Sequence, residues 1–460
     1  MKVIRKKRFL LLDTRNVMSA DNVELKVGCV IKHNANPLMM EDKPWEKRFD
    51  NLYGNVLYDE GEKLYKCWYS PFIVAHSSKN MSLSQRKRIT YEGHDSQEMG
   101  ICYATSEDGL KWDKPDLQVI SFEGSYRNNI VWRGPHGAGI FKDTRAENKS
   151  QLYKSIFQGL KTSYSEDGLS WSTARKIVSK DKIAGDTHNN VIWAPTLEKY
   201  VAFTRTWGKT DRKLEGPPTK INHAWGREVS RIESSDFMEW SRPEVVLGCN
   251  SYNHQPYAMP IFYHANTYIG LLAIHDQNSD RVWTELAWSP DTKNWRRINK
   301  GEPFIHCSED ILDYDYGCVY ACAAPIFLDN EIRIYYGGSD WLHTSWRNGC
   351  LALATIRPDG FAGYEQVNPK KIGVVTTQIF KQTGQAIKIT ADIKENGWLE
   401  ANLFDEKNEP IAKERIYETS TDKLVFAPHI TRLKSIRLEF KLNGAKIYSI
   451  VFEDYDSHNG

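Results

Sequence analysis

The sequence has little to suggest a zinc site, a membrane span or a nucleic-acid-binding surface. Among its 460 residues are eight cysteines, none in a Cys-x-x-Cys pair, so we expect mostly buried, reduced thiols and no metal ligands. No apolar run approaches the roughly 20 residues that span a bilayer. The net charge of +2 is spread without blocks of one sign, so we expect no nucleic-acid partner and no membrane association.

A targeting segment is also missing from the visible sequence. The opening "MKVIRKKRFLLL" has basic residues and a short apolar run, but the run ends at Asp13, too early for a signal-peptide core. We therefore expect a cytoplasmic protein or, where a signal peptide has been removed, a periplasmic or secreted one. The sequence leaves the oligomeric state open.

Aromatic residues, by contrast, are abundant. They make up 12% of the chain, with 15 Trp and 23 Tyr. Such a composition favours β-strands and surfaces that stack against flat ligands such as sugar rings. The length suggests two or three domains.

A short motif, Ser-x-Asp-Gly-x-x-Trp, recurs along the first three quarters of the chain. It appears as "TSEDGLKW", "YSEDGLSW", "SSDFMEW", "WSPDTKNW" and "TIRPDGF", closing on Trp112, Trp171, Trp240, Trp295 and Phe361, at intervals of 55 to 69 residues. Each copy follows an alternating apolar run and has the turn residues of a β-hairpin. An apolar run, a turn and an aromatic-rich run precede each copy.

The repeat therefore predicts five four-stranded units, an all-β fold with a five-bladed β-propeller over residues 45–369. Residues 1–44 are expected to form a lead-in that packs on, or completes, the propeller. After about residue 370 the motif stops and alternating strands with polar turns continue, which predicts a C-terminal β-sandwich over 370–460.

Strand direction separates structural aspartates from candidate functional ones. The Asp-Gly turns and the turns after each inner strand share one face of a propeller. Asp59, Asp143, Asp108 and Asp167 fall on that face and are interpreted as turn formers. The inner strands begin on the opposite face, around the axis, where side chains from all blades can meet in one pocket.

Candidates on that opposite face come from strand starts and from the loops that follow the second strands. Asp50 and Asp186 are interpreted as a pair of carboxylates that could act as base, nucleophile or pKa-tuning partner, with Glu285 as a further candidate catalytic carboxylate. The candidate substrate-binding residues are Asn51, Arg133, His136, His188, Asn189, Arg205, Trp207, His254, Gln255, Asp276, Asp315, Asp340 and Trp341.

The "SEDGLKW" turns, the five units and the appended sandwich resemble the five-bladed propeller glycoside hydrolases of families 32, 43 and 68. The resemblance implies an enzyme that cleaves a glycosidic bond, possibly a furanosidic one, with three inner-strand carboxylates. Asp50 matches the first by register and Asp186 resembles the middle one. Where the third is expected, the sequence reads "YNHQPY", with His254 and Gln255.

This departure keeps three functions open. The leading hypothesis is hydrolysis of an oligosaccharide or polysaccharide without a cofactor, although a divalent cation such as Ca²⁺ in the channel is an alternative. The second is a glycan-binding propeller without catalysis. The third is a glycoside phosphorylase on the same fold, with Arg133, Arg205 and His136 as an anion site.

Overall fold

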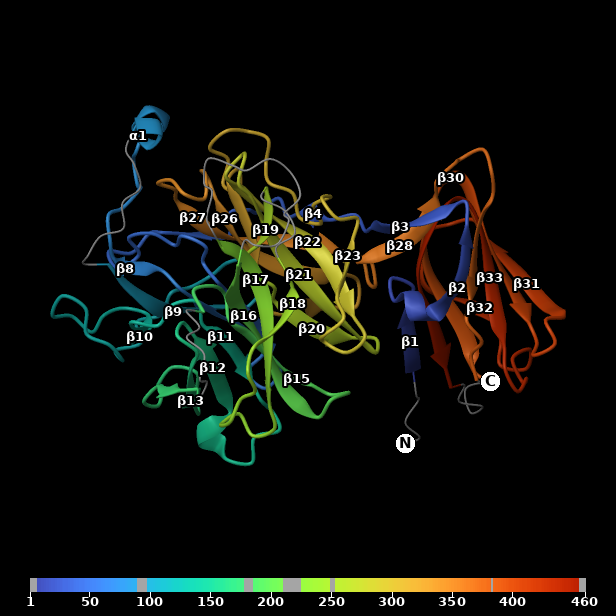
Figure 1. Ribbon diagram of the computed structural model, residues 1–460, viewed down its shortest axis with the longest axis horizontal. Helices are drawn as coiled ribbons and strands as arrows, with labels where there is room; N and C mark the ends of the chain where they lie inside the picture. Colours follow the sequence, from blue (N-terminus) through green and yellow to red (C-terminus); the bar gives the residue numbers. More distant parts are fainter. Residues whose placement is uncertain are drawn as a thin grey trace.

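The structure is a computed structural model that describes residues 6–88, 97–177, 185–209, 225–248, 253–381 and 384–454. Within these ranges the helical elements are α1 (Leu83–Arg88) and the 3-10 turns η1 (Thr14–Asn16) and η2 (Lys149–Gln151), and none is long and apolar enough to cross a membrane. Figure 1 shows the strands in two parts, a larger assembly of sheets beside a smaller orange and red one. The predicted β-propeller followed by a β-sandwich is confirmed.

The first three units of the propeller, here called blades one to three, are separate antiparallel sheets. Blade one contains β6 (Asn55–Asp59), β7 (Leu64–Tyr69), β9 (Glu98–Ser106) and β10 (Ile130–Arg133), with β8 (Phe72–Val74) beside β9. Blade two contains β11 (Gly139–Lys142), β12 (Tyr153–Phe157), β13 (Lys161–Ser165) and β14 (Arg175–Lys176). Blade three contains β15 (Asn190–Ala194), β16 (Lys199–Lys209), β17 (Trp225–Ser234) and β18 (Glu244–Leu247).

Blades four and five are joined through a parallel pair between Val282 and Cys318. Blade four contains β19 (His254–Pro256) and β20 (Ile261–His264) on the inside, then β21 (Thr267–Asp276), β22 (Arg281–Ser289) and β23 (Arg296–Ile298). Blade five contains β24 (Cys318–Ala321) and β25 (Ile326–Phe327), then β26 (Ile332–Ser339) and β27 (Gly349–Ile356), with β4 (Ile31–Lys32) and β5 (Met39–Met40) as its outer edge.

Contacts between inner strands join neighbouring blades in cyclic order. Blade five meets blade one at the bridge between Asn55 and Ala323, and blade two meets blade three at Ala138 and Asn189. Two asparagines make the remaining links. Oδ1 of Asn55 accepts from the amide of Ile140 in blade two, and Oδ1 of Asn190 accepts from that of Ile261 in blade four.

Buried clusters between successive blades explain the nearly continuous apolar runs of some strands. In β21, Ile269 and Leu271 belong to the core shared with blade five, whereas Leu272 and Ile274 belong to the core shared with blade three. Successive side chains of a strand point to opposite faces. A strand with a neighbouring blade on each side therefore needs apolar residues at both odd and even positions.

Four of the five repeated turns share one hydrogen-bonding pattern. In the first, Oγ of Ser106 accepts from the amide of Gly109, and Oδ1 of Asp108 accepts from the amides of Leu110 and Lys111. The turns at Asp167, Asp236 and Asp291 repeat the two bonds that the aspartate accepts. The repeated aspartate is therefore a turn former, as the sequence predicts.

The C-terminal sheet combines strands from both ends of the chain. It contains β1 (Lys6–Leu10), β2 (Val17–Asp21) and β3 (Val23–Val27) with β28 (Ala362–Gln366), β29 (Gly373–Thr377), β30 (Ala386–Phe404), β31 (Pro410–Ile416), β32 (Ser420–Phe426) and β33 (Arg437–Glu453). The long strands β30 and β33 pair along both halves of the sheet, with a shift of register between Ile393 and Trp398. Their apolar faces enclose a separate core. The segment 1–44 is thus divided between this sheet and blade five.

The fifth repeated turn joins the two parts. Asp359 is buried, and its carboxylate accepts from Arg8 and from Ser449 of the sandwich and lies 3.3 Å from Nε2 of His264 in blade four. The turn aspartate is exposed or half-buried in the other copies, whereas here it is buried as a contact between propeller and sandwich.

Candidate active site

Asp50 and Asp186 lie on the face where the inner strands begin, because Asp50 precedes β6 and Asp186 precedes β15. Asp50 adopts a positive φ of 56°, and its carbonyl accepts from Oγ of Ser339. Its Oδ1 lies 2.5 Å from Nη2 of the buried Arg347 and 3.8 Å from Nε of Arg48. This ion pair holds the carboxylate in place while 16% of the side chain stays exposed.

Asp186 is more accessible, with 47% of its side chain exposed. Oδ1 lies 3.3 Å from Nε2 of His136, and Oδ2 lies 2.9 Å from Nη2 of Arg205. The hydrogen bond from His136 and the charge of Arg205 lower the pKa of Asp186 well below its usual range, against the opposing effect of burial. Asp186 is therefore an ionised carboxylate that can reach a ligand.

Three tyrosines lie beneath these carboxylates. The rings of Tyr53 and Tyr320 have centroids 6.1 Å apart, and those of Tyr257 and Tyr320 are 5.3 Å apart. Nδ2 of Asn51 donates to the hydroxyl of Tyr53, and Oδ1 of Asn51 accepts from Arg347. Burial raises the pKa of Tyr53 and Tyr320 well above the usual value, so both stay protonated.

His188 and Asn189 are buried, and the ring centroid of His188 lies 5.5 Å from that of Tyr53. Nε2 of His188 lies 3.2 Å from Oδ1 of Asn55, and burial, with a smaller effect of His136, lowers the pKa of His188 to about 3. Asn189 donates to the carbonyls of Gly137, Gly185 and Thr187. The predicted ligand contacts of these two residues are thus replaced by contacts that hold blades together.

The hairpin of β16 and β17 brings Arg205, Trp207 and Arg227 to one face, since Trp207 pairs with Arg227 and Arg205 lies two residues earlier. Trp207 is 38% exposed. Gln255, predicted as a substrate contact, accepts instead from Nη1 of Arg227 at 3.2 Å. We define the axial cluster as Asp50, Asn51, Tyr53, His136, Asp186, His188, Arg205, Trp207, Arg227, Gln255, Tyr257, Tyr320 and Arg347.

One group next to the axial cluster has the composition of a metal site. Ligand atoms of His275, Asp280 and His343 all lie within 4.8 Å of one another. Nη1 of Arg227, however, lies 3.4 Å from Nδ1 of His275. Burial lowers the pKa of His343 well below its usual value, and the nearby His275 and the cationic Arg347 lower it further. The positive charge around this trio disfavours a divalent cation, and Ca²⁺ in addition prefers oxygen ligands.

Several predicted site residues lie elsewhere. Glu285 is fully buried, and its carboxylate accepts from Arg297, the indole of Trp283 and the amide of Gly301. Asp315 is also fully buried, 2.6 Å from Nζ of Lys32. Both carboxylates are satisfied within the protein, so neither joins Asp50 and Asp186.

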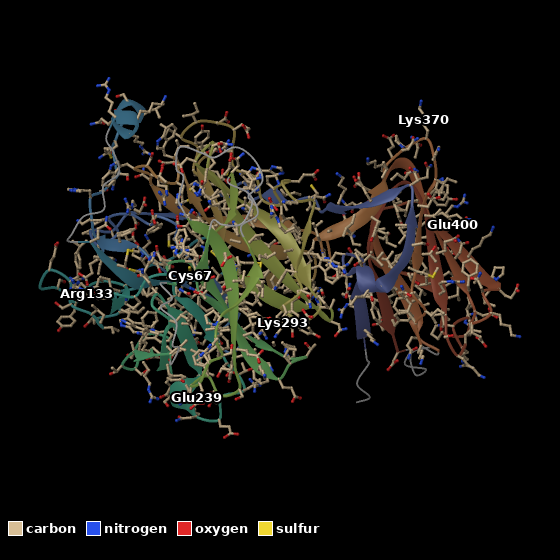
Figure 2. All side chains as sticks on the ribbon, viewed as in Figure 1. Cys67, Arg133, Glu239, Lys293, Lys370 and Glu400 are labelled. Atoms are coloured by element: carbon tan, nitrogen blue, oxygen red, sulfur yellow. The ribbon has the colours of Figure 1, made fainter. Side chains whose placement is uncertain are left out.

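Arg133 lies away from the axial cluster, because it belongs to an outer strand and not to an inner one. It ends β10, the outermost strand of blade one, and forms a bidentate ion pair with Glu98. Figure 2 shows it at the edge of the propeller. The sequence pattern predicts that this segment is level with the starts of the inner strands, whereas the inner strand of blade two is β11.

Four further candidates lie elsewhere in blades four and five. Asp340 accepts from Arg86 and from the amide of Asn348, and Trp341 is buried and stacks on Tyr316. His254 and Asp276 face each other at 3.9 Å across β19 and β21. His254 also lines a cavity of about 210 Å³ between blades three and four, together with Leu247, Pro256 and Arg297.

Sequence reasoning missed Arg227, Arg347 and Asp280. Arg227 follows a long connection after Trp207, so the register that brings the two together is not visible in the sequence. Arg347 lies in "TSWRNG", directly before β27, a position like that of Asp50 before β6, and this position is the signal that could have drawn attention to it.

The fold and the cluster define a β-propeller with an axial, arginine-rich polar site and an appended sandwich. No protein-family model and no curated protein matches the sequence. Solved structures similar to it include a β-1,2-mannobiose phosphorylase from Listeria innocua, 14% identical, covering 71% of this chain and 96% of that one, with a TM-score of 0.46. A fructofuranosidase from Schwanniomyces occidentalis is 10% identical, and the match covers 93% of this chain and 99% of that one, with a TM-score of 0.43. An N-acetylgalactosamine deacetylase from F. plautii is 11% identical, and the match covers 74% of this chain and 97% of that one, with a TM-score of 0.46.

Proposed function

We propose that this chain cleaves a glycosidic bond of an oligosaccharide or polysaccharide at the axial cluster. The observation that supports this most is Asp186, a half-exposed carboxylate held in its ionised form by His136 and Arg205. Asp50 supplies a second carboxylate, from the segment that leads into blade one. The exposed ring of Trp207 offers an aromatic surface of the kind on which sugars stack.

The proposed chemistry rests on the two carboxylates. Glycoside cleavage passes through a transition state with positive charge on the sugar ring, which an adjacent carboxylate stabilises. In this proposal Asp50 acts as base or nucleophile, and Asp186 stabilises the developing charge. Arg347 and Arg205 fix the orientation of these carboxylates before the sugar binds.

The test is release of reducing sugar from a panel of defined glycans. Asp186→Asn should lower the rate by roughly 10²–10⁴-fold, as expected for loss of a catalytic carboxylate. Its melting temperature should fall less than that of Asp50→Asn, because Asp186 is half exposed, although the buried Arg205 loses its carboxylate partner. Asp50→Asn should also lose activity, but it leaves the buried Arg347 without its partner, so unfolding must be measured in parallel. Equal release by the wild type and both variants would contradict the proposal.

A second candidate, glycan binding without cleavage, is favoured by the pairing of both carboxylates with arginine. A carboxyl group stabilised in its ionised form is a poor proton donor, yet it accepts hydrogen bonds from sugar hydroxyls well. Calorimetry separates the two candidates. Binding of an intact glycan that is never shortened on long incubation supports this second candidate.

A further inference from the structure

The two arginines beside Trp207 form an unusual arrangement on the β16–β17 hairpin. The guanidinium carbon of Arg205 lies 5.0 Å from the centre of the Trp207 ring, and that of Arg227 lies 5.3 Å from it. The same two groups lie 5.4 Å and 4.9 Å from the ring of Tyr257. Two cations thus share two aromatic rings at one place in the axial cluster.

The charges of the two arginines are balanced differently. Arg205 has a carboxylate partner, Asp186. Within the described residues, Arg227 has only neutral partners, Oε1 of Gln255 at 3.2 Å and Nδ1 of His275 at 3.4 Å. The Nε atoms of Arg205 and Arg227 are buried and make no hydrogen bond in that part of the chain.

An unpaired guanidinium that is removed from water is costly unless an anion compensates its charge. Burial and the repulsion from Arg205 lower the pKa of Arg227, although nearby Tyr257 opposes this. Trp207 is the solvent-exposed member of this arrangement of two arginines and two aromatic rings. An anion that arrives with a ring able to stack on Trp207 would meet both requirements at once.

We infer that Arg227 and Arg205 form a subsite for a negatively charged group carried by the glycan, a carboxylate or a sulfate, with the sugar ring against Trp207. The inference rests on the proposed function and names its substrate class as acidic glycans. The planar guanidinium groups offer the paired N–H donors that bind such oxyanions in a bidentate manner.

The experiment compares glycans that differ only in charge. Oligogalacturonides are paired with their methyl esters, and sulfated oligosaccharides with their desulfated forms. Binding is measured by calorimetry in low and high salt. At least one charged member should bind the wild type about tenfold or more tightly than its neutral counterpart, as expected for a charge-assisted contact, and added salt should reduce the difference.

Three variants test where this preference arises. Arg227→Gln should remove the preference. Arg227→Lys should keep part of it, since the charge remains but the paired N–H donors of the guanidinium are lost. Arg145→Gln is the matched control. Arg145 also lies over a tryptophan, at 3.2 Å from the ring of Trp193, but on the opposite face. This control should bind like the wild type, and melting temperatures verify that each variant is folded.

Several outcomes would overturn the inference. One is a wild type that prefers no charged member of any pair, and another is an Arg227→Gln variant that is folded and keeps the preference. A third is tight binding of inorganic phosphate or sulfate alone that depends on Arg227 and is not displaced by charged glycans, which would assign the subsite to a free ion. Charge-selective binding without any sugar release would instead reject only the proposed cleavage.

Discussion

The two faces of the propeller use the same residue type in opposite ways. On the face of the turns, Asp59 and Asp143 are each only 3% exposed, and lysines bind them, with Nζ of Lys142 at 2.7 Å from Asp59 and Nζ of Lys154 at 2.8 Å from Asp143. On the opposite face, Asp186 is paired with arginine and remains 47% exposed. A carboxylate enclosed by lysines fastens strands together, whereas one oriented by arginine and open to solvent is available to a ligand.

The largest effect on stability should come from the enclosed carboxylates. Asp59→Asn would leave Lys66 and Lys142 without their shared partner, and breaking such a buried pair costs about 3–5 kcal/mol. Thermal and urea unfolding should reveal the loss, while the rate of sugar release per folded molecule stays at the wild-type level. Asp186→Asn should instead lower the rate of sugar release per folded molecule, with a smaller loss of stability. If both substitutions changed activity alike, the distinction between the two faces would fail.

A smaller effect on stability should come from lowering the pH. His188 has a pKa of about 3 in the folded protein, below its ordinary value, so the unfolded chain binds the proton more readily. Stability should therefore fall as the pH drops from about 6.5 towards 3, by about 2 kcal/mol at pH 5 from this residue alone.

The comparison that isolates this effect is His188→Gln, whose amide can still donate to Asn55. Its melting temperature should decline less between pH 7 and pH 5 than that of the wild type. Because His275 and His343 are present in both proteins, their titration cancels in the difference. Parallel pH profiles for the two proteins would show that His188 is not the buried group responsible.

The smallest effect should come from the exposed repeated turns. Asp108→Ala removes the acceptor for the amides of Leu110 and Lys111, a loss of about 1 kcal/mol. The neighbouring Glu107→Ala is the control and should leave the unfolding curve unchanged. Neither substitution should alter sugar release, since both residues lie on the face away from the axial cluster. A loss of activity in folded Asp108→Ala would contradict that placement.

The sequence was informative where the signal is local. The Ser-x-Asp-Gly turns set the order of strands, and this order correctly separates Asp108 and Asp167, which cap turns, from Asp50 and Asp186 on the opposite face. The strand that holds Arg133 was harder to assign. "NNIVWRGPHGAGIF" contains two apolar runs close together, and period-two alternation alone does not tell the last strand of one blade from the first strand of the next.

Long-range partners account for the remaining differences. Nothing local to Glu285 or Asp315 reveals that Arg297 and Lys32 neutralise them. Likewise, Arg227 gains its significance from Trp207 across a hairpin with a long connection. Arg347 gains its significance from Asp50, which leads into the neighbouring blade one. Burial and ion pairing of this kind depend on the closed fold, so they are visible only once the strands are assembled.

The division of the segment 1–44 between two structures has a consequence for synthesis. Strands β4 and β5 complete blade five, and β1 pairs with β33, with Lys6 opposite Glu453. Strands that leave the ribosome early therefore have partners that emerge late. Blade five can be completed only after β27 has emerged, and the sandwich only after β33. A cut near residue 370 would keep blade five whole but would remove β1, β2, β3 and β28 from the C-terminal sheet. The sandwich therefore forms last, when the end of the chain returns to strands made at its beginning.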